Sequence, residues 1–121
     1  MQQPPSSDLP ADSSLQTKLH SIAQLLREAD HLSPEAQQAL AEIVDELGKA
    51  LHSVPASSEE TKALADSTAH LVRAVHQKHD QGLLAAARER MRLAITRVEN
   101  QAPFVAQIAG RLLDTLASLG I

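Results

Sequence analysis

The amino-acid sequence predicts an all-α protein, an antiparallel bundle of four or five helices with coiled-coil-like packing. Apolar residues recur along the chain at alternating spacings of four and three, which places them on one face of a helix. This recurrence restarts after each of several turn signals. In 121 residues there is no cysteine, tryptophan or tyrosine and only one phenylalanine, so aliphatic side chains must build the core. A chain of this length is expected to form one domain.

The first helix is predicted over residues 14–30. Residues 1–13 contain three prolines, three serines and two aspartates around a single leucine, so we expect a disordered N-terminal tail. Ser13 or Ser14 would cap the helix that follows. Its apolar stripe consists of Leu15, Leu19, Ile22, Leu26 and Ala29.

The second helix, residues 34–52, has the clearest start in the chain. Ser33 is a typical capping residue, Pro34 suits the first helical position, and Glu35 is favoured in a first turn. The short connection to the first helix predicts that the two are antiparallel neighbours. Gly48 interrupts the helix at a cost of up to about 1 kcal/mol relative to alanine, so we expect close packing there. The stripe consists of Ala36, Leu40, Ile43, Leu47 and Leu51.

Two further helices are predicted over residues 58–79 and 83–99. Ser57 and Glu60 form a capping box for the first of them. The segment Asp80-Gln81-Gly82 favours a break, because the stripe after it does not continue the earlier heptad. The alternative is one helix of about 63 Å from Ser58 to Glu99, which would need a partner chain to cover it. The first stripe is Leu64, Thr68, Leu71, Val72 and Val75, and the second is Leu84, Ala87 or Arg88, Met91, Ile95 and Val98.

The last helix is predicted over residues 103–119. Pro103 suits its first position and Gly120 its C-terminal cap. Its stripe consists of Val105, Ile108 or Ala109, Leu112, Leu116 and Leu119. An amphipathic helix can also lie on a membrane, but the polar face here holds only Arg111 and Asp114 and lacks the expected cationic character. We therefore expect the apolar face of this helix to pack in the core or to form a dimer seam.

The charge of the chain is mildly negative and unevenly distributed. Fifteen acidic residues against eleven basic ones give a net charge of −4, with −5 in residues 1–57 and +1 in residues 58–121. This balance does not indicate a nucleic-acid binder. The absence of cysteine, of a secretory leader and of an apolar run long enough to span a bilayer predicts a cytoplasmic protein without a membrane span.

Histidine gives one alternative function, because the chain has six of these residues. On a helix, His76 and His79 would share a face with Asp80, at spacings that suit a metal ion. Only these two or three ligands are local, and no cysteine supports them. We expect no metal or cofactor, and keep regulatory metal or ligand binding as an alternative.

A second alternative is weak nucleic-acid binding through the arginines of residues 83–99, which are Arg88, Arg90, Arg92 and Arg97. Acidic residues interrupt this set, and residues 83–99 contain no aromatic side chain that could stack on a base. We instead expect these arginines to pair with acids of the second helix, namely Glu42, Asp45 and Glu46. No phosphate loop or nucleophile motif occurs, so the sequence predicts no enzyme and no catalytic residue.

The two ends of the chain resemble a family of small bacterial proteins, domain of unknown function forty-four-oh-four. That family opens with a leucine-heptad hairpin, matched here by Leu15 to Leu51. It closes with a helix ending in glutamate, a His-Pro turn, an amphipathic helix and a terminal Met-Gly-Ile. The corresponding segments here are Val98-Glu99, Ala102-Pro103, Asp114 to Ala117 and Leu119-Gly120-Ile121.

The chain departs from that family pattern at several places. Ala102 replaces the histidine, Leu119 replaces the methionine, and residues 57–82 are additional length. The resemblance implies a bacterial cytoplasmic helical protein and no catalytic residue. The regular stripes predict a non-enzymatic protein–protein interaction or self-assembly module, whose partner is a second copy, as in a homodimer, or another helical protein.

Overall fold

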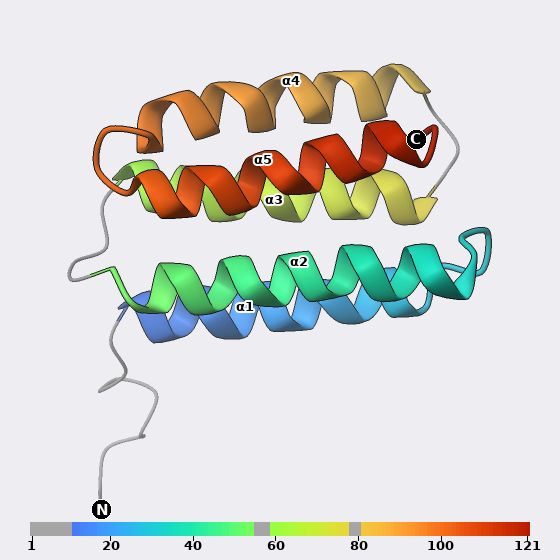
Figure 1. Cartoon of the computed structure of the whole chain (residues 1–121), viewed down its shortest axis with the longest axis horizontal. Helices are drawn as coiled ribbons and strands as arrows, with labels where there is room; N and C mark the ends of the chain where they lie inside the picture. The colour runs from blue at the N-terminus through green and yellow to red at the C-terminus, as the bar shows by residue number, and fades with distance from the viewer. Residues whose placement is uncertain (1–10, 55–58, 78–80) are drawn as a thin grey trace, which may run out of the picture.

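The computed structural model describes residues 11–54, 59–77 and 81–121, and this part of the chain forms a bundle of five helices (Figure 1). The helices are α1 (Ala11–Arg27), α2 (Pro34–His52), α3 (Glu59–Gln77), α4 (Gln81–Val98) and α5 (Pro103–Ser118). These residues contain no strand. The all-α prediction is therefore confirmed.

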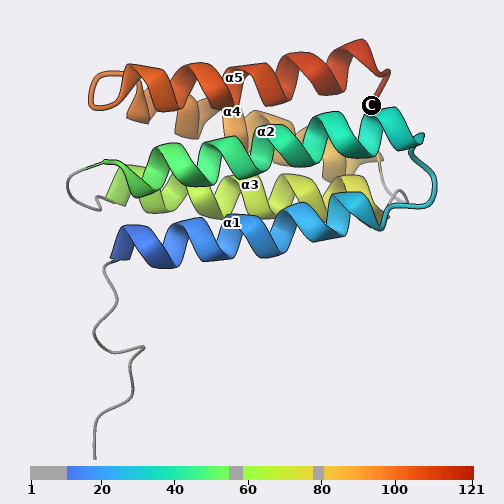
Figure 2. The ribbon, with the colours of Figure 1, turned by 60° about the horizontal axis from the view of Figure 1, so that its bottom comes forward.

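The five helices pack as a ring in which each has two principal neighbours. The neighbouring pairs are α1–α2, α2–α5, α5–α4, α4–α3 and α3–α1. Helices α1, α3 and α5 run in one direction, and α2 and α4 run in the other (Figures 1 and 2). An odd number of helices cannot alternate in direction all the way around a ring, so one pair must be parallel. That pair is α1–α3, and the predicted antiparallel packing holds for the others.

The bounds of α1 differ from the prediction at both ends. The helix begins at Ala11, three residues before the expected start, so Ser13 and Ser14 lie inside it and neither is its cap. Residues 1–10 of the predicted tail lie outside the described part. At the other end α1 stops at Arg27 rather than Asp30, and tighter turns follow.

The start of α2 and its close contact with α1 are as predicted. The Ser33 hydroxyl accepts a hydrogen bond from the Ala36 amide at 3.1 Å, and Pro34 is the first helical residue. A Cβ placed on Gly48 would lie 3.3 Å from the Cβ of Leu19. Glycine at this position therefore lets α1 and α2 approach closely.

Helices α3 and α4 are separate and pack side by side, so the single long helix does not form. Helix α4 begins at Gln81, which places Gly82 in its first turn and the break before it. The predicted capping serine, Ser57, lies outside the described residues.

The C-terminal end of α5 has a glycine cap. Gly120 has φ of +78°, a left-handed conformation that favours glycine. The Gly120 amide donates to the Ala117 carbonyl at 3.1 Å, and the Ile121 amide donates to the Leu116 carbonyl at 2.9 Å. These two bonds satisfy carbonyls that the end of the helix leaves unpaired. The predicted cap at Gly120 is confirmed.

The core prediction is confirmed in large part and wrong at one residue. The stripes of α1 and α2 are buried throughout, and so is the stripe of α3. At the two stripe positions with two candidates, Ala87 or Arg88 and Ile108 or Ala109, the buried residues are Ala87 and Ala109. Leu119, however, is 42% exposed, whereas Ile121 packs against the core. The positive φ of Gly120 reverses the chain, so Ile121 folds back and takes the place expected for Leu119.

Candidate functional site

Helix α4 carries apolar side chains on its outer surface as well as on its inner one. Its buried residues are only Ala87, Met91, Ala94 and Val98. Leu83 and Leu93, on the same helix, are 50% and 57% exposed. The other large exposed apolar side chains in the described part of the chain are Phe104 of α5 and Leu119. Two exposed leucines on one helix indicate a surface that is not fully covered within this chain.

These two leucines lie along a groove between α3 and α4. The groove consists of two hollows of about 210 and 260 Å³ that share Arg90. We call this feature the α3–α4 groove. Its first hollow is lined by His70, Arg73, Ala74, Gln77, Leu83, Ala86, Ala87 and Arg90. Its second is lined by Ala63, Asp66, Ser67, Arg90, Leu93, Ala94 and Arg97.

The α3–α4 groove is positively charged. Arg73, Arg90 and Arg97 are all exposed, and none of them forms an ion pair with another described residue. Among the described lining residues the one acid is Asp66, which is already paired with Lys18 of α1. Three guanidinium groups therefore face solvent beside two exposed leucines.

The predicted pairing of the α4 arginines with acids of α2 is wrong. Helices α2 and α4 are not principal neighbours in the ring, and no ion pair among the described residues joins them. Asp45 of α2 pairs instead with Arg27 of α1 at 3.0 Å. Glu46 of α2 makes two hydrogen bonds with Arg111 of α5, at 3.0 and 3.2 Å.

The contact between Glu46 and Arg111 shifts the pKa of both groups. The hydrogen bonds from Arg111 lower the pKa of Glu46 below its ordinary value, against a smaller opposing effect of burial. The same contact raises the pKa of Arg111. Both shifts favour the charged forms, as expected when a carboxylate accepts from a guanidinium.

The four predicted arginines of α4 divide among three surroundings. Arg90 and Arg97 line the α3–α4 groove. Arg92 lies 3.8 Å from Glu89 of its own helix. Arg88 donates to the main-chain oxygen of Ile121, the last residue of the sequence, at 3.0 Å. Sequence reasoning missed Arg73, because nothing local shows that this α3 residue lies beside α4.

The candidate metal ligands are only partly described. His76 is half-buried near the end of α3, whereas His79 and Asp80 fall outside the described residues. Within the part that is described, no three histidine or acidic side chains gather as metal ligands. No described helix is both long and apolar enough to cross a bilayer.

Comparison of the chain with protein-family models, with curated proteins and with solved structures gave no significant match. The resemblance to domain of unknown function forty-four-oh-four therefore stays a prediction.

Proposed function

We propose that this protein is a non-enzymatic protein–protein interaction module that binds an acidic amphipathic helix of another protein in the α3–α4 groove. The observation that carries the proposal is the combination, on one face, of two exposed leucines and three arginines without acidic partners among the described residues. Exposed apolar side chains bordered by charge are typical of a docking surface. A groove between two helices is also a common seat for a third.

The spacing of the groove residues suits a helical ligand. Leu83 and Leu93 are ten positions apart on α4, or about 15 Å along its axis. Arg90 lies between them, and Arg97 follows it two helical turns later. A partner helix of about four turns would place apolar side chains on both leucines and acidic side chains on both arginines.

The charge of the groove favours a different protein over a second copy. In a two-fold symmetric dimer built on this groove, the same arginines would approach each other across the axis. In the described residues, the other large exposed apolar side chains lie on and just after α5, which carries only Arg111 and Asp114 as charged residues. No described helix of this chain is therefore both acidic and apolar on its outer face. The regular apolar stripes also predict self-association, and the binding experiment below includes a test for a dimer.

The proposal is tested with a labelled synthetic peptide. The peptide is an amphipathic helix of about four turns with leucines at spacings of three and four and flanking glutamates. Its control has lysine at each glutamate position. Fluorescence anisotropy should show saturable binding of the acidic peptide and none of the basic one. Replacing Arg90 and Arg97 together by glutamate should weaken binding by about tenfold or more.

Arg92→Glu is the matched control, because Arg92 is exposed on the same helix but lies outside the groove. This variant should bind the acidic peptide like the unmodified protein. Equal binding by R90E/R97E and R92E would overturn the proposal. So would tighter binding of a DNA oligonucleotide than of the peptide, or a dimer in sedimentation that R90E/R97E dissociates and R92E does not.

A further inference from the structure

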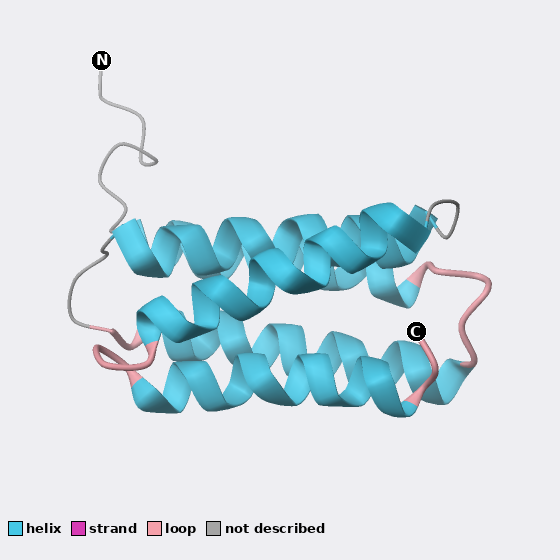
Figure 3. Ribbon diagram, turned by 90° about the horizontal axis from the view of Figure 1, so that it is seen from above, coloured by secondary structure: helices cyan, strands magenta, loops and turns pink. Residues whose placement is uncertain are grey.

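The first hollow of the α3–α4 groove gathers polar side chains from both helices. It has a volume of about 210 Å³ and lies between the C-terminal half of α3 and the first turns of α4, which run side by side (Figures 1 and 3). Its polar groups are two guanidiniums, an imidazole and an amide, from Arg73, Arg90, His70 and Gln77. The other described lining residues are alanines and Leu83, so none is acidic.

The packing of α3 on α4 brings the two guanidiniums within reach of one ligand. Oγ1 of Thr68 lies 3.4 Å from Sδ of Met91, so these two residues are at the same level along the bundle. Because α3 and α4 run in opposite directions, Arg90 is about level with residue 69. Arg73 follows four residues later on α3, about 6 Å along the axis. The long side chains of Arg73 and Arg90 can span this separation and approach one anion from opposite walls.

The donors of this hollow are not engaged elsewhere in the described part of the chain. The side chains of Arg73, Gln77 and Arg90 form no hydrogen bond or ion pair with another described residue. Nδ1 of His70 donates to the carbonyl oxygen of Asp66 at 2.9 Å. His70 is therefore oriented by its own helix and borders the hollow without adding a permanent charge.

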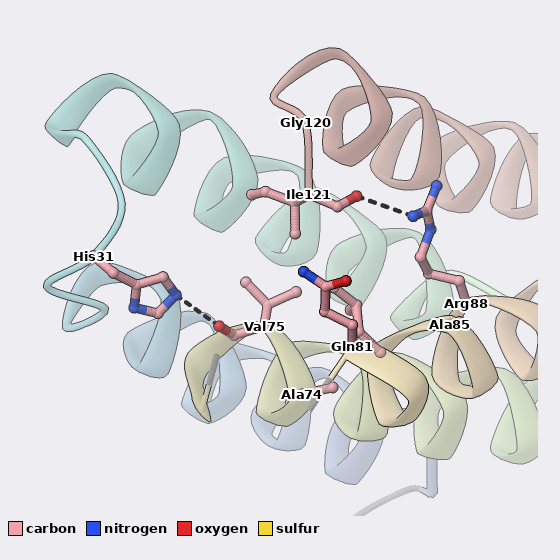
Figure 4. Close-up of a pocket in the computed structure, with 9 residues that line it drawn as sticks. His31, Ala74, Val75, Gln81, Ala85, Arg88, Gly120 and Ile121 are labelled. Atoms are coloured by element: carbon pink, nitrogen blue, oxygen red, sulfur yellow. Dashed lines mark hydrogen bonds between the residues drawn. The ribbon is translucent and has the colours of Figure 1, made fainter. Parts of the chain in front are cut away.

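The arginines of α4 outside the groove differ from Arg90, because they already have partners. Arg92 lies 3.8 Å from Glu89. Arg88 donates to the main-chain oxygen of Ile121 at 3.0 Å (Figure 4). The positive charge that remains available on α4 is thus concentrated in the groove.

Two permanent cations without a described acid beside them match an anion of two charges. A phosphate monoester carries a charge of about −1.5 to −2 at pH 7 and three acceptor oxygens. Guanidinium groups bind such oxygens through paired hydrogen bonds. A single carboxylate would neutralise only one of the two arginines. The chemistry of the first hollow therefore favours a phosphate monoester over a carboxylate.

We propose that the first hollow binds a phosphoserine or phosphothreonine of the partner helix, with Arg73 and Arg90 donating to the phosphate oxygens. This inference rests on the proposed function, in which the α3–α4 groove holds that helix. The phosphate takes the place of the carboxylate on Arg90, whereas Arg97 in the second hollow still meets a carboxylate. Phosphorylation of the partner then strengthens its binding to this protein.

The test uses the labelled acidic peptide and a set of derivatives, each with phosphoserine in place of one glutamate. Every glutamate position is tried, because a helix can lie in the groove in either direction. Fluorescence anisotropy should show that at least one derivative binds about tenfold or more tightly than the parent peptide. The same derivative with unphosphorylated serine should bind no more tightly than the parent.

Arg73→Gln should remove the preference for the phosphopeptide and leave binding of the parent peptide unchanged, since the parent's glutamates lie on Arg90 and Arg97. Arg73 is exposed and has no described partner, so this variant should melt at the same temperature as the unmodified protein. Arg73→Lys keeps the charge without the paired donors and should retain part of the preference. Arg97→Gln is the matched control, because it should weaken both peptides by the same factor and keep their ratio.

The outcomes separate this inference from the proposed function. If the parent peptide binds and no phosphoserine derivative binds more tightly, the inference is wrong and the proposed function is retained. If no peptide of either kind binds, both are wrong. The inference is also overturned if R73Q keeps the preference, if free phosphoserine binds as tightly as the phosphopeptide, or if a DNA oligonucleotide binds more tightly than the phosphopeptide.

Discussion

The close approach of α1 and α2 at Gly48 leads to a quantitative prediction, because α5 offers a matched control. Gly48 and Gly110 both lie inside helices. Replacing a glycine inside a helix by alanine stabilises the helix by about 1 kcal/mol when the added methyl group has room. A Cβ at Gly110 meets no heavy atom within 4 Å. Gly110→Ala should therefore raise the free energy of unfolding by the full amount of about 1 kcal/mol.

The same substitution at Gly48 should lose this gain. Its added Cβ would lie 3.3 Å from the Cβ of Leu19, 3.4 Å from the carbonyl oxygen of Gln16 and 3.5 Å from the Cα of Gln16. Two of these atoms belong to the backbone, so relief requires a shift of α1 itself. Overpacking of this kind costs about 1–3 kcal/mol. The net effect of Gly48→Ala should lie between zero and a loss of about 2 kcal/mol.

Thermal and urea denaturation followed by circular dichroism measure both variants. For a domain of this size, 1 kcal/mol corresponds to about 4 °C in melting temperature. G110A should melt about 4 °C above the unmodified protein, and G48A at or below it. If the free energy of unfolding falls with urea concentration at the same slope in both variants, both expose the same amount of surface on unfolding. If G48A is stabilised as much as G110A, the close packing of α1 on α2 is refuted.

Three further predictions concern helix ends and the ion pair between α2 and α5. Ser33→Ala should lower the free energy of unfolding by about 1 kcal/mol, because it removes the hydroxyl that accepts from the Ala36 amide. Ser33→Thr keeps a hydroxyl and should keep most of the stability, and urea denaturation would distinguish the two variants. Gly120→Ala should cost about 1–2 kcal/mol for the left-handed backbone, and an unchanged melting temperature would contradict the cap. The lowered pKa of Glu46 contributes stability above the carboxyl's unfolded pKa, and this stability is lost as pH falls through the lower folded value. With Glu46→Gln, the free energy of unfolding should therefore fall less steeply as pH is lowered into the acidic range. Arg111→Lys should retain part of the pH dependence of the unmodified protein.

The ends of several helices were predictable because their chemistry is local. Ser33 with Pro34 sets the start of α2, and Gly120 sets the end of α5 through a backbone conformation that other residues adopt only with strain. The buried stripes were predictable for a similar reason, since spacings of four and three place residues on one face. The start of α1 was missed because several neighbouring residues could begin a helix.

The candidate sites were less predictable, because they depend on which helices are neighbours. The sequence shows arginines on α4 and acids on α2, but these two helices are not principal neighbours in the ring. Glu46 of α2 instead accepts hydrogen bonds from Arg111 of α5. The contribution of Arg73 to the groove and the hydrogen bond between His31 and Val75 both follow from contacts between distant segments. No spacing within one helix carries that information.

Helix α4 also offers a second control for the α3–α4 groove. At 3.6 residues per turn, Arg88 and Arg90 point about 200° apart around the helix axis, so Arg88 reaches the main-chain oxygen of Ile121 while Arg90 lines the groove. Arg90 and Arg97, seven positions apart, differ by only about 20° and share the groove. Arg88→Gln should therefore leave the acidic peptide bound, whereas R90E/R97E should release it. Loss of peptide binding in R88Q would mean that the bundle itself, rather than the groove, has been disturbed.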